Sequence, residues 1–96
     1  MRIIKLMPDY GCFPLWEASP DAVGNIDPNT LPISASLVSE LDNWAAQYDA
    51  TLDQENPLQS GFASIEEEHR FAEVGRGLCT KIQKELGRDF EVSLKL

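Results

Sequence analysis

Alternating apolar and polar residues mark both ends of the chain as strands. Near the N-terminus, Ile4 and Leu6 alternate with charged residues, and this two-residue period is typical of a half-buried strand. The clearest alternation lies at the other end, where the apolar members are Phe90, Val92, Leu94 and Leu96. Because two strands are stable only when another element covers their apolar face, we expect helices between them to do so.

A period of three to four residues predicts a helix over 34–52. The apolar members lie on one side of the helical wheel; they are Leu37, Val38, Leu41, Trp44, Ala45, Tyr48 and Leu52.

A second helix is predicted over 64–86. Ser64 and Glu67 have the spacing of a capping box, and Gly87 is well placed to end the helix in a left-handed conformation. The apolar stripe of this helix consists of Phe71, Gly75, Leu78, Cys79, Ile82 and Leu86.

Gly75 lies near the middle of that stripe, where it lowers helix propensity. A glycine there allows a bulky neighbour to approach the helix closely. We expect Trp44 of the first helix to be this neighbour.

The segment Met7–Ile33 is rich in proline but carries many apolar side chains. Structureless loops of this length are uncommon in compact domains, and its apolar content argues against disorder. We expect it to be ordered against the core, with a short strand near Leu15–Glu17.

These elements predict one α+β domain spanning residues 1–96, in the order strand, loop, helix, helix, strand. The terminal strands form a small sheet packed against an antiparallel pair of helices, with a long ordered loop after the first strand. Their relative direction stays open. The sheet could recruit a strand from the loop, or pair its edge with a second copy to form a homodimer.

Composition and charge then limit the function. The 96 residues are 43% hydrophobic and 25% charged, with a net charge of −8, which is the balance of a folded globular chain. Residues 34–63 contain five acidic and no basic side chains. The net charge argues against binding to nucleic acid or anionic membranes, and it permits a basic protein partner, whose approach it would accelerate.

The N-terminal segment lacks the apolar stretch of a secretory signal. The chain has only two cysteines, Cys12 and Cys79, far apart in the sequence. We therefore expect no disulfide framework, and we expect a cytoplasmic location.

Few residues have the setting that catalysis or metal binding requires. His69, the only histidine, falls off the apolar stripe of its helix, and Cys79 belongs to that stripe as a core thiol. One histidine and two scattered cysteines do not make a zinc site. We therefore predict no catalytic residue, metal or cofactor, and consider an enzyme less consistent with the sequence than a binding protein.

The best candidate surface is an acidic helix face. Asp42, Asp49 and Asp53 project within about 40° of one another at 100° per residue. No Lys or Arg on this helix offsets them. A solvated face is one interpretation, and a docking surface for a basic partner is the other.

The long loop gives an alternative site. Tyr10, Trp16, Glu17 and Asp27 all lie within it, and folding could gather them into a pocket for a small ligand or for acid–base chemistry. Asp27 before Pro28 is also typical of a turn or helix cap.

Several strings resemble a family of small uncharacterised bacterial proteins. They are LMPDYGCFPLW at 6–16, GNIDP at 24–28, LPIS at 31–34, SGF at 60–62, and the pairs Trp44-Ala45 and Tyr48-Asp49. The resemblance covers most of the chain to about Phe62. It implies a defined packing for the long loop but supplies no catalytic residues.

The leading hypothesis is a non-enzymatic binding protein, of the kind represented by immunity or antitoxin-like inhibitors, that docks a basic partner through the acidic helix face. A small-ligand or enzymatic domain using Met7–Ile33 is the first alternative. A structural subunit of a larger assembly is the second.

Overall fold

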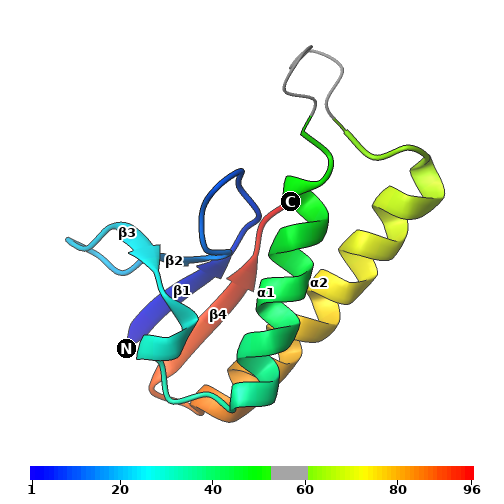
Figure 1. Cartoon of the computed structure of the whole chain (residues 1–96). Helices are drawn as coiled ribbons and strands as arrows, with labels where there is room; N and C mark the ends of the chain where they lie inside the picture. Colours follow the sequence, from blue (N-terminus) through cyan, green and yellow to red (C-terminus); the bar gives the residue numbers. More distant parts are fainter. Residues whose placement is uncertain (53–60) are drawn as a thin grey trace.

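A single mixed sheet lies at the centre of the computed structural model, which describes residues 1–52 and 61–96 (Figure 1). Its order is β3-β2-β1-β4, and the strands are β1 (Arg2–Leu6), β2 (Leu15–Glu17), β3 (Gly24–Ile26) and β4 (Phe90–Leu94). The terminal strands β1 and β4 are adjacent, as predicted, and run parallel, whereas β2 is antiparallel to both β1 and β3.

The two helices are α1 (Ala35–Asp49) and α2 (Ile65–Leu86). Ser34 and Ser64 cap their N-termini, because each hydroxyl accepts a hydrogen bond from the backbone N–H three residues later, at 3.2 Å. Gly87 ends α2 with φ +80°. α1 stops at Asp49, short of the predicted Leu52, because the N–H of Leu52 bonds to the Asp49 carbonyl in a tighter turn.

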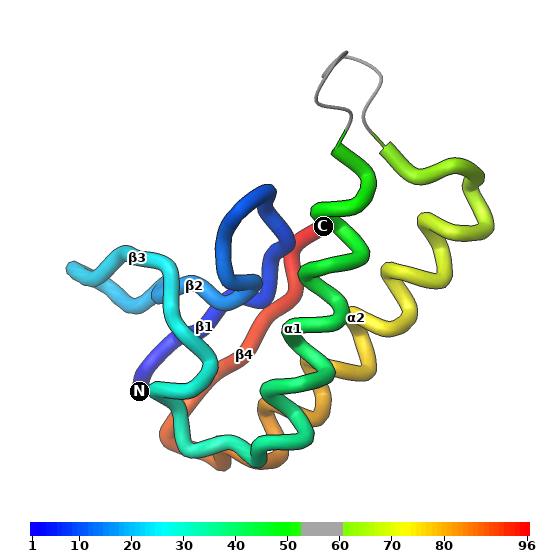
Figure 2. Tube along the Cα trace, in the orientation of Figure 1, coloured from blue at the N-terminus to red at the C-terminus, as the bar shows by residue number. Residues whose placement is uncertain are grey.

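The helices run antiparallel and cover one face of the sheet, as Figure 2 shows. Register places Leu6 of β1 between Leu15 of β2 and Leu94 of β4 on that face. The buried core joins all the layers and consists of Ile4, Leu6, Leu15, Ile26, Leu31, Leu37, Leu41, Trp44, Phe71, Leu78, Ile82 and Leu86. The predicted α+β architecture is confirmed. None of the helices in the described residues is long and apolar enough to cross a membrane.

The long loop is ordered, and the predicted strand at Leu15–Glu17 is present as β2. The loop also contains β3 and the short 3₁₀ helix η1 (Pro28–Thr30). β3 was not expected, since Gly24-Asn25-Ile26 has a single apolar residue and no visible alternation. The C-terminal strand is shorter than its pattern suggested, because Leu96 lies beyond β4 and is 62% exposed.

Trp44 and Gly75 bring the helices together. A Cβ added at Gly75 would lie 2.8 Å from Trp44 Cζ2, so only glycine admits the indole at this distance. The indole stacks on Phe71 with ring centroids 4.4 Å apart, and its Nε1 donates to the Phe71 carbonyl at 3.0 Å. The contact predicted from the sequence is therefore present, and it fixes α1 against α2.

Gln83 of α2 covers the outer edge of the sheet at β4. Its Nε2 donates to the Phe90 carbonyl at 2.7 Å, and its Oε1 accepts from the Val92 N–H at 2.8 Å. Edge strands with unsatisfied backbone groups invite pairing with another chain. A side-chain amide that satisfies both a donor and an acceptor therefore works against pairing at this edge.

Replacement of Gly75 by Ala is expected to destabilise the fold. Overpacking against the fixed indole costs about 1–3 kcal/mol, which exceeds the helix propensity gained, about 1 kcal/mol. Gly77→Ala is the matched control, because nothing lies within 4 Å of a Cβ there, and it should stabilise. Urea unfolding of both variants measures the difference; equal stabilisation by both would contradict the packing account.

Gln83→Leu is expected to lower the free energy of unfolding by about 1–3 kcal/mol, because the Phe90 carbonyl and the Val92 N–H lose their side-chain hydrogen bonds. The same variant is expected to promote self-association through the β4 edge. Lys84→Leu adds the same apolar group at an exposed neighbouring position. Chemical denaturation and sedimentation velocity compare the two variants. If Lys84→Leu self-associates as strongly as Gln83→Leu does, the added apolar surface and not the exposed strand edge causes the association.

Glu17 is expected to make the free energy of unfolding depend on pH in the acidic range. Its carboxylate accepts from Ser19 Oγ and from Arg2 Nε, each at 2.7 Å; the Ser19 bond, and then Arg2, lower the pKa of Glu17 below its ordinary 4.5 despite an opposing effect of burial. The stabilisation is therefore present above pH 4.5 and is lost as the pH falls through the lower folded-state pKa.

The measurement is urea unfolding of the wild type and Glu17→Gln at about pH 6 and about pH 3.5. The wild type should lose more stability between these conditions than Glu17→Gln does. Glu91→Gln, which removes a carboxylate from an exposed position of β4, should behave like the wild type. An equal acid loss in the wild type and Glu17→Gln would exclude this role.

Candidate functional site

The acidic residues of α1 divide into paired and unpaired ones. Glu40 accepts a hydrogen bond from Lys81 Nζ of α2 at 2.7 Å. Within residues 1–52 and 61–96, neither Asp42 nor Asp49 forms an ion pair, and both are exposed. Asp53, the third member of the predicted acidic face, lies outside the described residues.

Asp42 and Asp49 line the same groove, of about 330 Å³. One wall is the face of α1, with Ala45 and Ala46 between the two carboxylates; the other wall comes from the long loop and β3. We name this feature the acidic groove, and its lining residues are Gly11, Cys12, Phe13, Pro14, Asn25, Asp42, Ala45, Ala46 and Asp49.

The loop wall is anchored to the helix by Asp49. The Asp49 Oδ1 accepts a hydrogen bond from the Gly11 N–H at 3.1 Å. Gly11 has φ +71°, a conformation that glycine adopts without strain. Asp49 therefore has two roles: it contributes charge to the acidic groove, and it holds the loop that forms the opposite wall.

Asn25 of β3 fixes the backbone of Phe13. The Asn25 Oδ1 accepts from the Phe13 N–H at 2.9 Å, and its Nδ2 donates to the carbonyls of Phe13 at 2.6 Å and Leu15 at 3.0 Å. Phe13 is nevertheless 42% exposed. The structure thus fixes the backbone of a partly exposed aromatic residue that lines a groove carrying two carboxylates.

The spacing within the acidic groove limits its chemistry. Asp42 and Asp49 are seven residues apart, about 10 Å along the helix axis, which does not bring two carboxylates together for acid–base work. Across the described residues, no group of three His, Cys, Asp or Glu side chains could hold a metal ion. The arrangement is suited to receiving cationic groups at two points along a helix.

A cluster of aromatic side chains lies beside the C-terminal end of α1. Tyr10 stacks on Tyr48 with centroids 4.6 Å apart, and its hydroxyl shares a hydrogen bond with Thr51 Oγ1 at 2.8 Å. Burial, together with the nearby Tyr10 and Asp9, raises the pKa of Tyr48. Phe62 and Phe71 continue the cluster toward α2, with centroids 5.0 Å apart.

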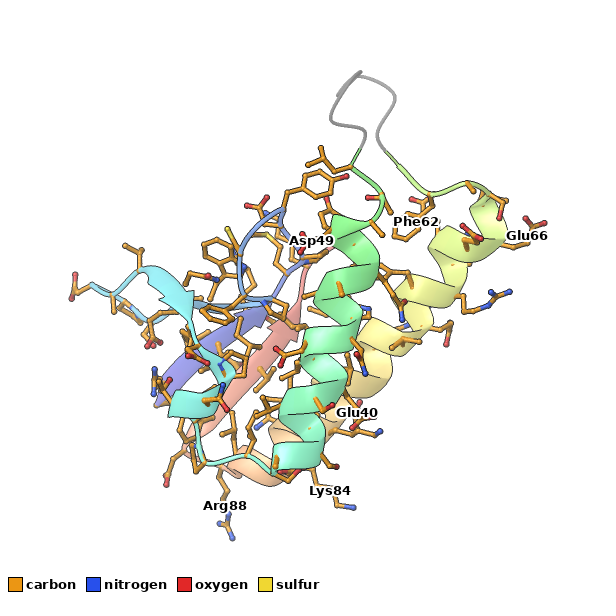
Figure 3. All side chains as sticks on the ribbon, in the orientation of Figure 1. Glu40, Asp49, Phe62, Glu66, Lys84 and Arg88 are labelled. Carbon is orange, nitrogen blue, oxygen red and sulfur yellow. The ribbon has the colours of Figure 1, made fainter. Side chains whose placement is uncertain are left out.

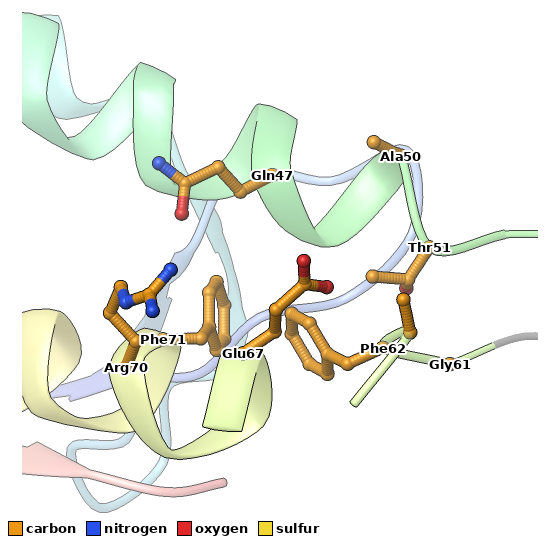
Figure 4. Close-up of a pocket in the computed structure, with 9 residues that line it drawn as sticks. Gln47, Ala50, Thr51, Gly61, Phe62, Glu67, Arg70 and Phe71 are labelled. Atoms are coloured by element: carbon orange, nitrogen blue, oxygen red, sulfur yellow. The ribbon is translucent and has the colours of Figure 1, made fainter. Parts of the chain in front are cut away.

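Two further cavities flank these rings. The inter-helix cavity, of about 530 Å³, lies between α1 and α2, and Figure 4 shows Gln47 of α1 on one side of it and Arg70 and Glu67 of α2 on the other. The other, of about 500 Å³, is lined by Met7, Pro8, Tyr10, Tyr48, Thr51, Gly61, Phe62, Glu68, His69, Phe71, Ala72, Lys95 and Leu96. Both have charges of each sign on their linings, whereas the charged residues of the acidic groove are both aspartates.

The residues of the alternative loop pocket make different contacts. Tyr10 lines the cavity of about 500 Å³. Trp16 Nε1 donates to the Met7 carbonyl at 3.0 Å, and Glu17 is bound to Ser19 and Arg2. Asp27 caps η1 by accepting from the Asn29 N–H at 2.9 Å.

The remaining titratable residues follow the sequence interpretation. His69 is exposed. Cys79 is partly buried against the core, and burial raises the pKa of its thiol, which disfavours the reactive thiolate.

Sequence reasoning did not identify Phe13 and Asn25. Both occur in the strings that carry the family resemblance, at 6–16 and 24–28. Their place in these strings was the one feature of the sequence that pointed to them. Their pairing depends on β3, which has no pattern of its own.

Charge is distributed along the length of the helices. Figure 3 shows Asp49 and Glu66 at the end where α1 finishes and α2 begins, and Lys84 and Arg88 at the opposite end.

Comparison with known proteins gives the chain its family. No curated protein sequence matches it. A family model described as Serratia CdiI immunity protein-like matches residues 2–95, which is nearly the whole chain of 96 residues. The matched range contains the residues that form the strands, both helices and the lining of the acidic groove in this chain. This chain therefore belongs to the Serratia CdiI immunity protein-like family.

Proposed function

We propose that this protein is an immunity protein that binds a toxin and neutralises it by covering a basic surface of that toxin with the acidic groove. The observation that carries the proposal is the family match over residues 2–95. An immunity protein acts by binding its partner, and the acidic groove offers two exposed carboxylates for such a contact.

The electrostatics of α1 support a basic partner. The chain carries a net charge of −8, and Asp42 and Asp49 are exposed on a helix without Lys or Arg. Opposite charge on a partner would accelerate encounter and set its orientation. The paired Glu40 points to a different use, because its contact with Lys81 joins the two helices.

The acidic groove is also prepared before binding. Asp49 and Asn25 tie its loop wall to α1 and β3 through the hydrogen bonds to Gly11 and Phe13. A wall that is already ordered loses little conformational entropy when a partner docks. Tight inhibition is favoured by such preorganisation.

The test is a binding measurement with the toxin recovered by low-salt co-purification from the bacterium that carries this gene. The Asp42→Asn/Asp49→Asn variant should bind about tenfold or more weakly, mainly through slower association and with a shallower salt dependence. Asn at 49 keeps an oxygen for the Gly11 N–H, so the loss reports charge rather than loop structure. Surface plasmon resonance at several salt concentrations gives both rates.

Asp89→Asn/Glu91→Gln is the matched control, because it removes two carboxylates from exposed positions near the α2–β4 connection. It should bind nearly as the wild type does. If both double variants weaken toxin binding equally, the loss is caused by the change in net charge and not by removal of the groove carboxylates. Binding unaffected by Asp42→Asn/Asp49→Asn would place the interface elsewhere.

A further inference from the structure

Phe13 is exposed although its position is fixed. Its backbone N–H and carbonyl are both bound by the Asn25 side chain, so the ring cannot retreat into the core by a loop shift without breaking these bonds. At 42% exposure, Phe13 leaves part of its apolar surface in water in the free protein. This exposed apolar surface lines the groove and is available for a contact in the complex.

The groove combines three features around that ring. Asp42 and Asp49 supply negative charge, and the methyl groups of Ala45 and Ala46 supply a small apolar surface between them. Phe13 adds an aromatic face on the opposite wall. A long cationic side chain fits this combination, because its methylene stem can lie on the alanines while its charged end meets a carboxylate.

We propose that the acidic groove receives an arginine side chain of the toxin, with the guanidinium against Phe13 and hydrogen-bonded to Asp42 or Asp49. This proposal rests on the proposed function and specifies the partner group that the same site recognises. Phe13 is then the residue that determines specificity, and Asp42 and Asp49 supply the charge.

Arginine suits the groove better than lysine does. A guanidinium is planar and weakly hydrated, so it stacks on an aromatic face while donating in its plane to a carboxylate. An ammonium is a compact, strongly hydrated charge that donates to a carboxylate more readily than it stacks on an aromatic ring. The aromatic wall therefore predicts a preference between two side chains of the same charge.

The test is an NMR titration of ¹⁵N-labelled full-length protein with acetyl-Gly-Arg-Gly-amide and, separately, acetyl-Gly-Lys-Gly-amide. The arginine peptide should produce saturable shifts at the amides of Phe13, Ala45 and Ala46. The lysine peptide should bind about threefold more weakly, the ratio expected from a cation–π contact at an exposed site.

Phe13→Leu should bind the two peptides equally, whereas Phe13→Tyr should keep the preference for arginine. Val23→Ala changes another exposed apolar side chain, which is 95% exposed and does not line the groove, and it should match the wild type. The dispersion of each spectrum confirms that the variant is folded.

Equal affinities in the wild type, an arginine preference that survives Phe13→Leu, or no saturable shift at the groove would each overturn the proposal. Failure here is distinguishable from failure of the proposed function. If Asp42→Asn/Asp49→Asn weakens toxin binding while Phe13→Leu leaves the peptide preference intact, the toxin-binding role stands and the arginine assignment does not.

Discussion

The fold depends on the contact between Trp44 and Gly75. The indole occupies space that a Cβ at Gly75 would enter, at 2.8 Å from Trp44 Cζ2, and it is held by stacking on Phe71 and by the hydrogen bond to the Phe71 carbonyl. Leu94 of β4 lies 3.5 Å from the same Cβ position. The indole thus sets the distance between the helices, and the Gly75 position of α2 also lies against the sheet at Leu94, so rotation of α1 about its axis is strongly restricted.

This restriction has a functional consequence. Asp42 lies about 160° from Trp44 around α1, so burying the indole directs the carboxylate away from α2 and toward the loop. The long loop contacts this side of α1 at Asp49, whose Oδ1 accepts a hydrogen bond from the Gly11 N–H at 3.1 Å. The acidic groove is therefore a product of core packing on one side of a helix and backbone hydrogen bonding on the other. Both contributions are made by residues that would remain in place without a partner.

Local chemistry explains which parts of the fold were predictable. Serine caps, a terminal glycine and apolar periodicity are properties of short segments, so the helix starts, the end of α2 and the Trp44–Gly75 contact follow from them. The parallel direction of β4 depends on where α2 returns the chain, at the end of the sheet where β1 begins (Figure 2). β3 is held by pairing with β2 and by Asn25 rather than by an apolar pattern, and the Phe13 wall of the groove was invisible for the same reason.

The helical wheel predicted the aspartate face, while the groove beside Asp42 and Asp49 was visible only in the three-dimensional structure. We propose that a basic toxin docks in this groove. Hydrogen exchange of the protein alone and in complex with its toxin tests the claim most directly. Protection should increase at Gly11, Phe13 and the α1 segment 42–49, with little change on the opposite face of the sheet around Trp16 and Ser93. Protection confined to the sheet face, with the groove unchanged, would contradict the account.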